Sequence, residues 1–126
     1  MDGLSVIFID DELAILDAIG RAAHRRFPKW KVQCISNPIN ALTVFQEQAQ
    51  SIQVLVCDIH MPEVSGVRIM QAVRSVLPHV SIIALSGQLD AKSIVGANKY
   101  ADVCLCKPVD TNIIFDAIIA LRARKE

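Results

Sequence analysis

The segment VLVCDIHMPEVSG, residues 54–66, decides how the rest of the chain is interpreted. Its first four residues are apolar and lead directly to Asp58. A short, continuous apolar run of this kind predicts a strand that is buried on both faces. A turn containing Pro62 follows, and Gly66 then opens a helical pattern. We therefore expect the Asp58 carboxylate at the carboxyl end of a strand, where open parallel sheets bind their ligands.

Three other polar pairs stand at the ends of similar apolar runs: Asp10-Asp11, Ser86-Gly87 and Lys107-Pro108. Strand patterns alternate with helical patterns along the chain, which predicts an α/β fold: a five-stranded parallel sheet with helices on both faces. Right-handed crossovers place the carboxyl ends of all the strands at one rim, so the four polar features should meet there. The predicted strands are 4–9, 31–35 (at an edge of the sheet), 53–58, 80–85 and 103–106. The predicted helices are 12–26, 37–49, 66–77, a less regular one within 88–100 that contains Gly96, and 110–121.

The helical patterns also predict which side chains face the core. Asn37 is expected to cap the second helix with Pro38 in its first turn, and Asp110 or Thr111 should cap the last one. The predicted inward positions are Leu13, Leu16, Ile19, Ala23, Phe27, Ala41, Leu42, Phe45, Ala49, Val67, Met70, Val73, Leu77, Ile113, Ile114, Ala117, Ile118 and Leu121.

Composition narrows the class of protein. The 126 residues are 52% apolar and 21% charged, which is typical of one globular domain. The net charge is zero, and the only basic cluster is the short tail 122–125, so no nucleic-acid footprint is indicated. No apolar run approaches the roughly 20 residues that cross a bilayer, and the amino terminus lacks the basic start of a signal peptide.

The four cysteines are Cys34, Cys57, Cys104 and Cys106. Three of them are predicted inside buried strands, where a thiol packs as a small apolar group. Cys104 and Cys106 form a C-x-C pair with no second pair at zinc-finger spacing. Reduced thiols in a cytoplasmic protein are therefore favoured over a metal site or a disulfide.

The predicted rim gathers three carboxylates, those of Asp10, Asp11 and Asp58. Carboxylates that lie close together repel one another, so a cation among them is expected, and hard oxygen ligands suit Mg²⁺. A carboxylate can accept a phosphoryl group as an aspartyl phosphate. The Lys107 ammonium and the Ser86 hydroxyl, with the main-chain N–H of Gly87, could bind the oxygens that the metal does not. The rim thus predicts a phosphoryl-transfer site.

Each of these features is ordinary when it is taken alone. Asp10 and Asp11 could cap a helix, and Asp58 could be a turn residue. A Ser-Gly pair often ends a strand, and a loop lysine is usually solvated. The joint position of all four features, each at the end of a different predicted strand, favours the single site.

These motifs resemble the receiver domain of bacterial two-component response regulators, of the chemotaxis-receiver kind. The match rests on Asp10-Asp11, on DIHMP at 58–62 with Gly66, on Ser86-Gly87 and on Lys107-Pro108, and it covers the whole chain. The resemblance implies a flavodoxin-like sheet of order 2-1-3-4-5. It further implies that Asp58 is the phosphoacceptor, that Lys107 contacts the phosphoryl group and that Ser86 moves to report it.

The resemblance also implies a magnesium site and a set of partners. Asp11, Asp58 and the main-chain carbonyl of His60 would bind Mg²⁺, with Asp10 acting through water, and no organic cofactor is expected. The phosphodonor would be a sensor histidine kinase or a phosphotransfer protein. The domain would be a switch that catalyses its own phosphorylation and slow dephosphorylation, and not an enzyme acting on a separate substrate. No membrane and no nucleic acid would bind directly.

Two departures from the family pattern bear on the output. The switch position three residues before Lys107 is usually aromatic, and here it is Cys104. Tyr100-Ala101 replaces the usual Gly-Ala before the fifth strand, so an unusual or mobile fourth helix is expected. The output surface would be the fourth helix, fifth strand and fifth helix, where a homodimer or a partner docks. Residues 1–126 would be one receiver domain, standing alone or preceding an effector such as an HD-type phosphodiesterase or a DNA-binding domain.

Two other functions compete with this one. An aspartate-nucleophile phosphatase of the haloacid dehalogenase kind needs Asp-x-Asp after the first strand, whereas the acids at 10–12 are adjacent. A receiver-like binding module without phosphorylation is the second alternative, which Cys104 and Tyr100 support and which the retained Asp58, Ser86 and Lys107 oppose.

Overall fold

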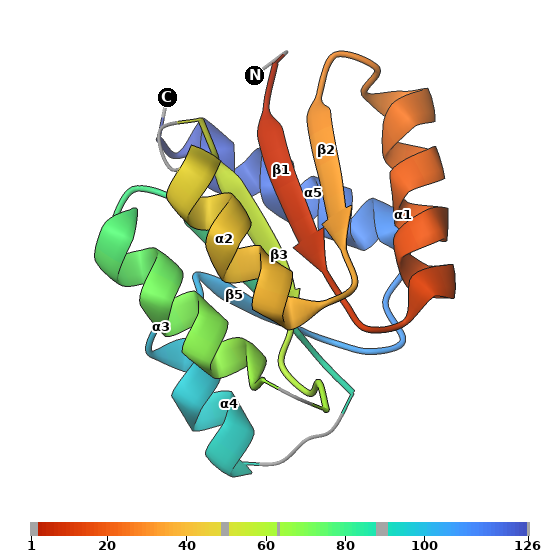
Figure 1. Ribbon diagram of the computed structural model, residues 1–126. Helices are drawn as coiled ribbons and strands as arrows, with labels where there is room; N and C mark the ends of the chain where they lie inside the picture. Colours follow the sequence, from red (N-terminus) through yellow and green to blue (C-terminus); the bar gives the residue numbers. More distant parts are fainter. Residues whose placement is uncertain (1–2, 49–50, 63, 88–90, 126) are drawn as a thin grey trace.

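The computed structural model describes residues 3–48, 51–62, 64–87 and 91–125. Strands and helices alternate along the chain (Figure 1). The strands are β1 (Ser5–Ile9), β2 (Lys31–Ile35), β3 (Val54–Asp58), β4 (Ser81–Ser86) and β5 (Val103–Cys106). The helices are α1 (Leu13–Arg26), α2 (Pro38–Gln48), α3 (Gly66–Val76), α4 (Ala91–Asn98) and α5 (Thr111–Ala123).

The five strands form one parallel sheet in the order β2-β1-β3-β4-β5, which confirms the predicted fold and strand order. Alternate side chains of each strand enter different cores. In β1, Val6 and Phe8 pack with α1 and α5, whereas Ile7 and Ile9 pack with α2, α3 and Ala97 of α4. Strands buried on both faces explain why the sequence shows continuous apolar runs.

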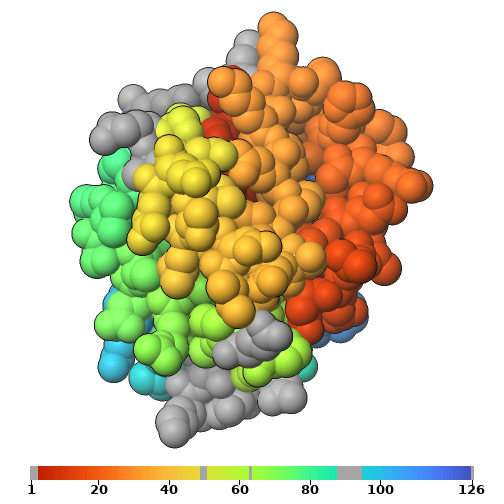
Figure 2. Space-filling model, in the orientation of Figure 1, coloured from red at the N-terminus to blue at the C-terminus, as the bar shows by residue number. Residues whose placement is uncertain are grey.

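Helices therefore cover both faces of the sheet, with α1 and α5 on one side and α2, α3 and α4 on the other (Figure 1). Figure 2 shows the atoms of α2 and α3 side by side on one face of the molecule, and the two helices are in contact. Within the described residues, no helix combines the length and apolar character that crossing a lipid bilayer requires. The arrangement leaves the rim at the carboxyl ends of the strands as the open edge on which a site can form.

Three predicted core positions are wrong. Leu13 is 69% exposed, Leu42 is 40% exposed and Ile113 is 51% exposed. Each stands in or beside an apolar run in which periodicity alone does not say which neighbour faces inward. In α5, the fully buried Phe115 fills the core instead, against the rings of Phe27 and Trp30. The predicted inward residue Ala49 lies outside the described residues.

The predicted helix starts are confirmed. The Asn37 side chain accepts a hydrogen bond from the main-chain N–H of Ile39 at 3.0 Å. Asp110 caps α5 by accepting from Asn112 N–H at 2.7 Å, so it and not Thr111 is the cap. Ser65 caps α3 in the same way, through Val67 N–H at 3.2 Å. Such caps satisfy N–H groups that the first turn of a helix leaves unpaired.

The connection from α4 to β5 is built without a left-handed residue, because no described residue has a positive φ. Arg74 of α3 binds this connection instead. Its guanidinium donates to the carbonyl oxygen of Tyr100 at 2.8 and 3.2 Å, to those of Val80 at 2.6 Å and Pro78 at 3.1 Å, and to the carboxylate of Asp102 at 3.1 Å. One charged group thus stabilises the Tyr100-Ala101 segment that departs from the family pattern. The mobility expected for the fourth helix stays a prediction.

We expect Arg74→Lys to lower the free energy of unfolding by about 2 kcal/mol, because a lysine cannot reproduce the planar set of donors. Urea unfolding monitored by the fluorescence of Trp30 measures the change. Arg68→Lys, an exposed position on the same helix, is the control and should have no effect. Equal unfolding midpoints for the two variants would contradict the role assigned to Arg74.

Candidate functional site

The strand register brings the predicted site residues to one rim. Ile9 of β1 pairs with Cys57 of β3, so Asp10 and Asp58 follow side by side. Asp58 pairs with Leu85, which places Ser86 one residue beyond the acceptor on the neighbouring strand. The parallel direction of the strands makes this juxtaposition a direct result of the topology.

Lys107 joins the carboxylates into one cluster. Its Nζ lies 2.8 Å from Asp10 Oδ2 and 3.2 Å from Asp58 Oδ2. Glu12 Oε1 lies 3.8 Å from the same Nζ. The side chains of Asp10 and Asp58 are only 2% and 5% exposed, so these are buried ion pairs. The predicted approach of Lys107 to Asp58 is confirmed, whereas no sequence pattern indicated the contact with Glu12.

The acidic group has the chemistry of a magnesium site. Oxygen atoms of Asp10, Asp11 and Asp58 lie within 4.8 Å of one another. Asp10 and Asp58 are buried, and Asp11 is exposed and open to solvent. Hard oxygen donors of this number suit Mg²⁺, which usually keeps several of its waters. The residues present therefore fit the ion, and the role of the His60 carbonyl in the site stays a prediction.

Electrostatics also indicate that the positive charge in the site is too small to balance its carboxylates. Burial raises the pKa of Asp58, Lys107 opposes this rise, and the charge of Asp10 adds to it. Burial alone would lower the pKa of Lys107, but its contacts with Asp10 and Asp58 raise it overall, so the ammonium stays charged. One ammonium does not offset three carboxylates, and a divalent cation would complete the balance.

The main chain around Asp58 is held tightly. The N–H of Ile59 donates to the carbonyl of Leu85 at 2.9 Å, and the N–H of Gly66 donates to the carbonyl of Ile59 at 2.9 Å. Asp58 Oδ1 accepts from the N–H of His60 at 3.2 Å. A Cβ atom on Gly66 would lie 2.0 Å from the Asp58 carbonyl oxygen, so only glycine fits there. The turn after β3 thus fixes the carboxylate in direction and in position.

Ser86 and Lys107 are linked through the main chain. The N–H of Lys107 donates to the carbonyl oxygen of Ser86 at 2.7 Å, and the peptide bond from Lys107 to Pro108 is cis. Ser86 is buried at the end of β4. Cys104, at the predicted switch position, is half-buried two residues from the end of β5. Because this hydrogen bond joins the two residues, a movement of either Ser86 or Lys107 would displace the other.

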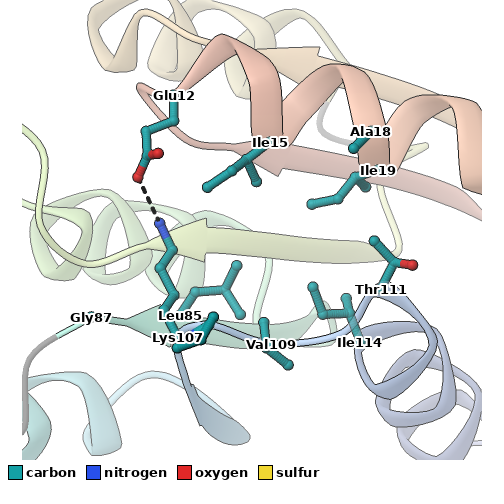
Figure 3. Close-up of a pocket in the computed structure, with 11 residues that line it drawn as sticks. Glu12, Ile15, Ala18, Ile19, Leu85, Gly87, Lys107, Val109, Thr111 and Ile114 are labelled. Carbon is teal, nitrogen blue, oxygen red and sulfur yellow. Dashed lines mark ion pairs between the residues drawn. The ribbon is translucent and has the colours of Figure 1, made fainter.

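A mostly apolar pocket of about 560 Å³ lies between α1 and the start of α5, beside Lys107. Figure 3 shows Ile15 and Ile19 of α1 facing Val109 and Ile114 across it, with the Glu12–Lys107 ion pair at one end. The carbon stem of Lys107 forms part of the wall. The lysine thus reaches the carboxylates across an apolar surface, which favours the extended side chain.

Two solved structures have the same fold as this chain. The structure of a response regulator receiver domain protein from Clostridium thermocellum is 30% identical, with a TM-score of 0.86 over 97% of this chain and 96% of its own. A CheY-like receiver domain protein from Methanospirillum hungatei has the same TM-score at 20% identity, over 98% of this chain and 97% of its own, and so shows the fold alone.

Two curated relatives match as well. The hydrogenase transcriptional regulatory protein HoxA of Cupriavidus necator is 30% identical over 96 residues, or 75% of this chain. The photosynthetic apparatus regulatory protein RegA of Rhodobacter capsulatus is 26% identical over 117 residues, or 92% of this chain. The chain spans 19% of the length of HoxA and 61% of that of RegA. A family model described as the response regulator receiver domain matches residues 6–119, and the chain therefore belongs to the family of response regulator receiver domains.

Proposed function

We propose that this receiver domain accepts a phosphoryl group on Asp58 from the phosphohistidine of a sensor histidine kinase or a phosphotransfer protein. The observation that carries the proposal is the position of the Lys107 ammonium, which lies within 3.2 Å of Asp58 and 2.8 Å of Asp10. Phosphoryl transfer depends mainly on positioning and on neutralising charge, and this cluster supplies both. Membership of the family supports a role in two-component signalling.

The residues of the chain have distinct parts in this reaction. The N–H of His60 holds Asp58 Oδ1 and Lys107 holds Oδ2, which orients the carboxylate as nucleophile. An oxygen–phosphorus bond forms at Asp58 while the phosphorus–nitrogen bond of the donor breaks, and the donor imidazole keeps the electron pair. Lys107 then binds a phosphoryl oxygen, and the Ser86 hydroxyl turns towards another.

Mg²⁺ would be held by Asp10, Asp11 and Asp58, with the main-chain carbonyl of His60. When bound, the ion neutralises charge on the phosphoryl oxygens and on the carboxylates around them. Asp10 also accepts a hydrogen bond from Glu12 N–H at 2.9 Å, which keeps its carboxylate turned towards the site. The same cluster would catalyse the slow hydrolysis of the aspartyl phosphate, so the switch resets itself.

The output we propose is a change in the surface formed by α4, β5 and α5. Phosphorylation would move Ser86 and, through its link to Lys107, the end of β5. Cys104 cannot report this by burying a ring, so the strand itself would carry the change to a second copy of the domain or to a partner. HoxA and RegA are, by name, regulatory proteins and are longer than this chain, which favours an effector that the receiver controls. Action in the cytoplasm, where thiols stay reduced, is part of the proposal.

Incubation with acetyl phosphate and Mg²⁺ is expected to add one phosphoryl group to the chain, detected by intact-mass spectrometry. Asp58→Asn should abolish the labelling, because the amide is not a nucleophile, and removal of Mg²⁺ with a chelator should do the same. Asp116→Asn, an exposed acid on α5, is the control and should label normally. If the unaltered chain took up no phosphoryl group under these conditions, the domain would be a binding module and the proposal would fail.

A further inference from the structure

The two thiols of β5 lie on one face of an open sheet edge. β5 is the last strand of the sheet and pairs only with β4 among the described strands. Its other face is taken by Val103 and Leu105, which pack against the core under α1 and α5. Cys104 packs on the opposite core, and Cys106 alternates with Leu105 to the same side. Cys104 is half-buried and Cys106 is exposed, so the prediction that both thiols are buried in the strand is wrong.

The spacing and the neighbours of these thiols allow them to bind one ion together. Positions two apart in a strand are about 6.6 Å apart along the backbone, which two flexible thiol side chains can bridge. The partners across the register are small: Ala84 lies opposite Cys104, and Ser86 lies opposite Cys106. Burial raises the pKa of the Cys104 thiol, and the neighbouring Cys106 raises it further, as expected of two thiols that are close together.

We propose that Cys104 and Cys106 form a two-thiolate binding site for Cu(I) on the β5 edge, beside the phosphorylation site. Soft thiolate ligands favour Cu(I), zinc and iron–sulfur clusters. Of these, Cu(I) is the one that two thiolates can bind alone. A structural zinc site needs four ligands. In the described part of the chain, the only group of three or more candidate metal ligands is the acidic one at the rim. The two thiols of Cys104 and Cys106 therefore have no third protein ligand beside them among the described residues.

Cys57 is not part of this site. It stands on the same face of the sheet, because Cys57 pairs with Ala84, which in turn pairs with Cys104. Two strand spacings separate Cys57 from Cys104, which is about 9.6 Å and too far for one ion. Cys57 is also fully buried, and its thiol donates to the carbonyl oxygen of Asp58 at 3.3 Å.

Binding is an exchange of protons for metal. Two S–H bonds break, two copper–sulfur bonds form and two protons pass to solvent. Copper enters and remains as Cu(I), so no oxidant or reductant is consumed. Cys106 directly precedes Lys107, so an ion that joins Cys104 to Cys106 would stiffen the strand end that carries the lysine. That consequence for signalling rests on the proposed function, whereas the binding itself does not.

The test is an anaerobic titration of the full, reduced chain with Cu(I) in competition with bicinchoninate. We expect one copper ion per chain, and a loss of about 100-fold or more in affinity for Cys104→Ser and for Cys106→Ser, because each variant loses the benefit of a second linked ligand. Cys34→Ser is the matched control, since Cys34 is an exposed single thiol on the opposite edge strand β2. Its affinity should equal that of the unaltered chain.

Three results would overturn the site: unchanged affinity in either β5 variant, an equal loss in Cys34→Ser, or one ion shared by two chains. Circular dichroism of each variant confirms that a serine in place of a thiol leaves the fold intact. The titration is repeated with Asp58→Asn, which is expected to bind Cu(I) normally. Because Asp58→Asn cannot be phosphorylated but should still bind Cu(I), a failure of phosphorylation can be distinguished from a failure of copper binding.

Discussion

Replacing Gly66 by alanine is expected to lower the free energy of unfolding by about 3 kcal/mol, the upper end of the usual cost of overpacking. The added Cβ would lie 2.0 Å from the carbonyl oxygen of Asp58 and 2.8 Å from the Cα atom of Ile59. Both neighbours are backbone atoms, so no change of rotamer can make room. The chain must instead displace either the start of α3 or the end of β3, and both are anchored in buried structure.

The other helical glycines provide matched controls. A Cβ at Gly20 would meet only the Sγ atom of Cys34 at 3.6 Å, and one at Gly96 would meet methyl groups of Val67 at 3.6 and 3.8 Å. These are ordinary contacts, so Gly20→Ala should gain about 0.5–1 kcal/mol from helix propensity. Urea unfolding followed by Trp30 fluorescence compares all three variants. If Gly66→Ala had the same urea midpoint as the two controls, the close approach of position 66 to the Asp58 carbonyl would be refuted.

The same variant should lose phosphorylation even where it is folded. At low temperature and without urea, the fraction of Gly66→Ala that remains native still has a displaced Asp58 main chain. Labelling by acetyl phosphate should then fall by about 100-fold, because an error of about 1 Å in position is costly in this kind of catalysis. Arg74→Lys, which is destabilised at a distance from the rim, should label at the normal rate when folded. Equal labelling of the two variants would mean that Gly66 serves stability alone.

The sequence was sufficient to predict the sheet because its three central strands are buried on both faces. Continuous apolar runs that end in Asp58 or Ser86 are typical of central parallel strands, and parallel topology then brings their ends together with that of the edge strand before Lys107. The strand order itself came from resemblance to the family. Arg74 was not foreseen, because its partners Tyr100 and Asp102 are distant in sequence and nothing local marks an arginine as half-buried among carbonyl groups.

Exposure was harder to predict than secondary structure. Leu42 and Ile113 each have apolar neighbours on their own helix. Only the packing of α2 and α5 on the sheet decides whether the residue or its neighbour is buried. Cys106 belongs to an apolar strand, but that strand is the edge of the sheet, so one side chain reaches solvent. The exposure of these residues depends on contacts with other elements of the fold, and periodicity within one element carries no information about such contacts.

The second large effect is expected for Lys107→Met, which removes the ammonium but keeps most of the apolar stem. Asp10 and Asp58 would then face each other in a buried site without their shared counter-charge. Removing one partner from a buried ion pair typically costs about 3–5 kcal/mol. We therefore expect this loss of unfolding free energy near neutral pH, measured by urea unfolding, with Lys99→Met as the exposed control.

The loss should depend on pH in a defined direction. The pKa of Asp58 is already raised by burial, and Lys107 is the largest influence that lowers it. Without the lysine the pKa of Asp58 should rise further above the unfolded value of 3.8. An acid whose pKa is raised by folding destabilises the native state above that pKa, and the penalty disappears as the pH falls through it. The loss of unfolding free energy in Lys107→Met should therefore shrink on acidification.

The lysine itself sets the limit on the basic side. The raised pKa of Lys107 means that the contribution of the ammonium to stability is present at neutral pH and is lost only as the pH rises through that pKa.

A second substitution separates stability from chemistry. Asp10→Asn added to Lys107→Met removes one of the two opposed charges, so it should recover much of the lost unfolding free energy near neutral pH. It cannot restore a cation beside Asp58, and phosphoryl labelling should stay about 100- to 1,000-fold below that of Asp10→Asn alone, which is the control for the loss of a proposed metal ligand, as when one preorganised electrostatic contact is removed. If the double variant regained both stability and labelling, Lys107 would be a structural counter-ion only. Recovery of stability, with labelling far below that of Asp10→Asn alone, would mean that the ammonium acts on the transferred phosphoryl group itself.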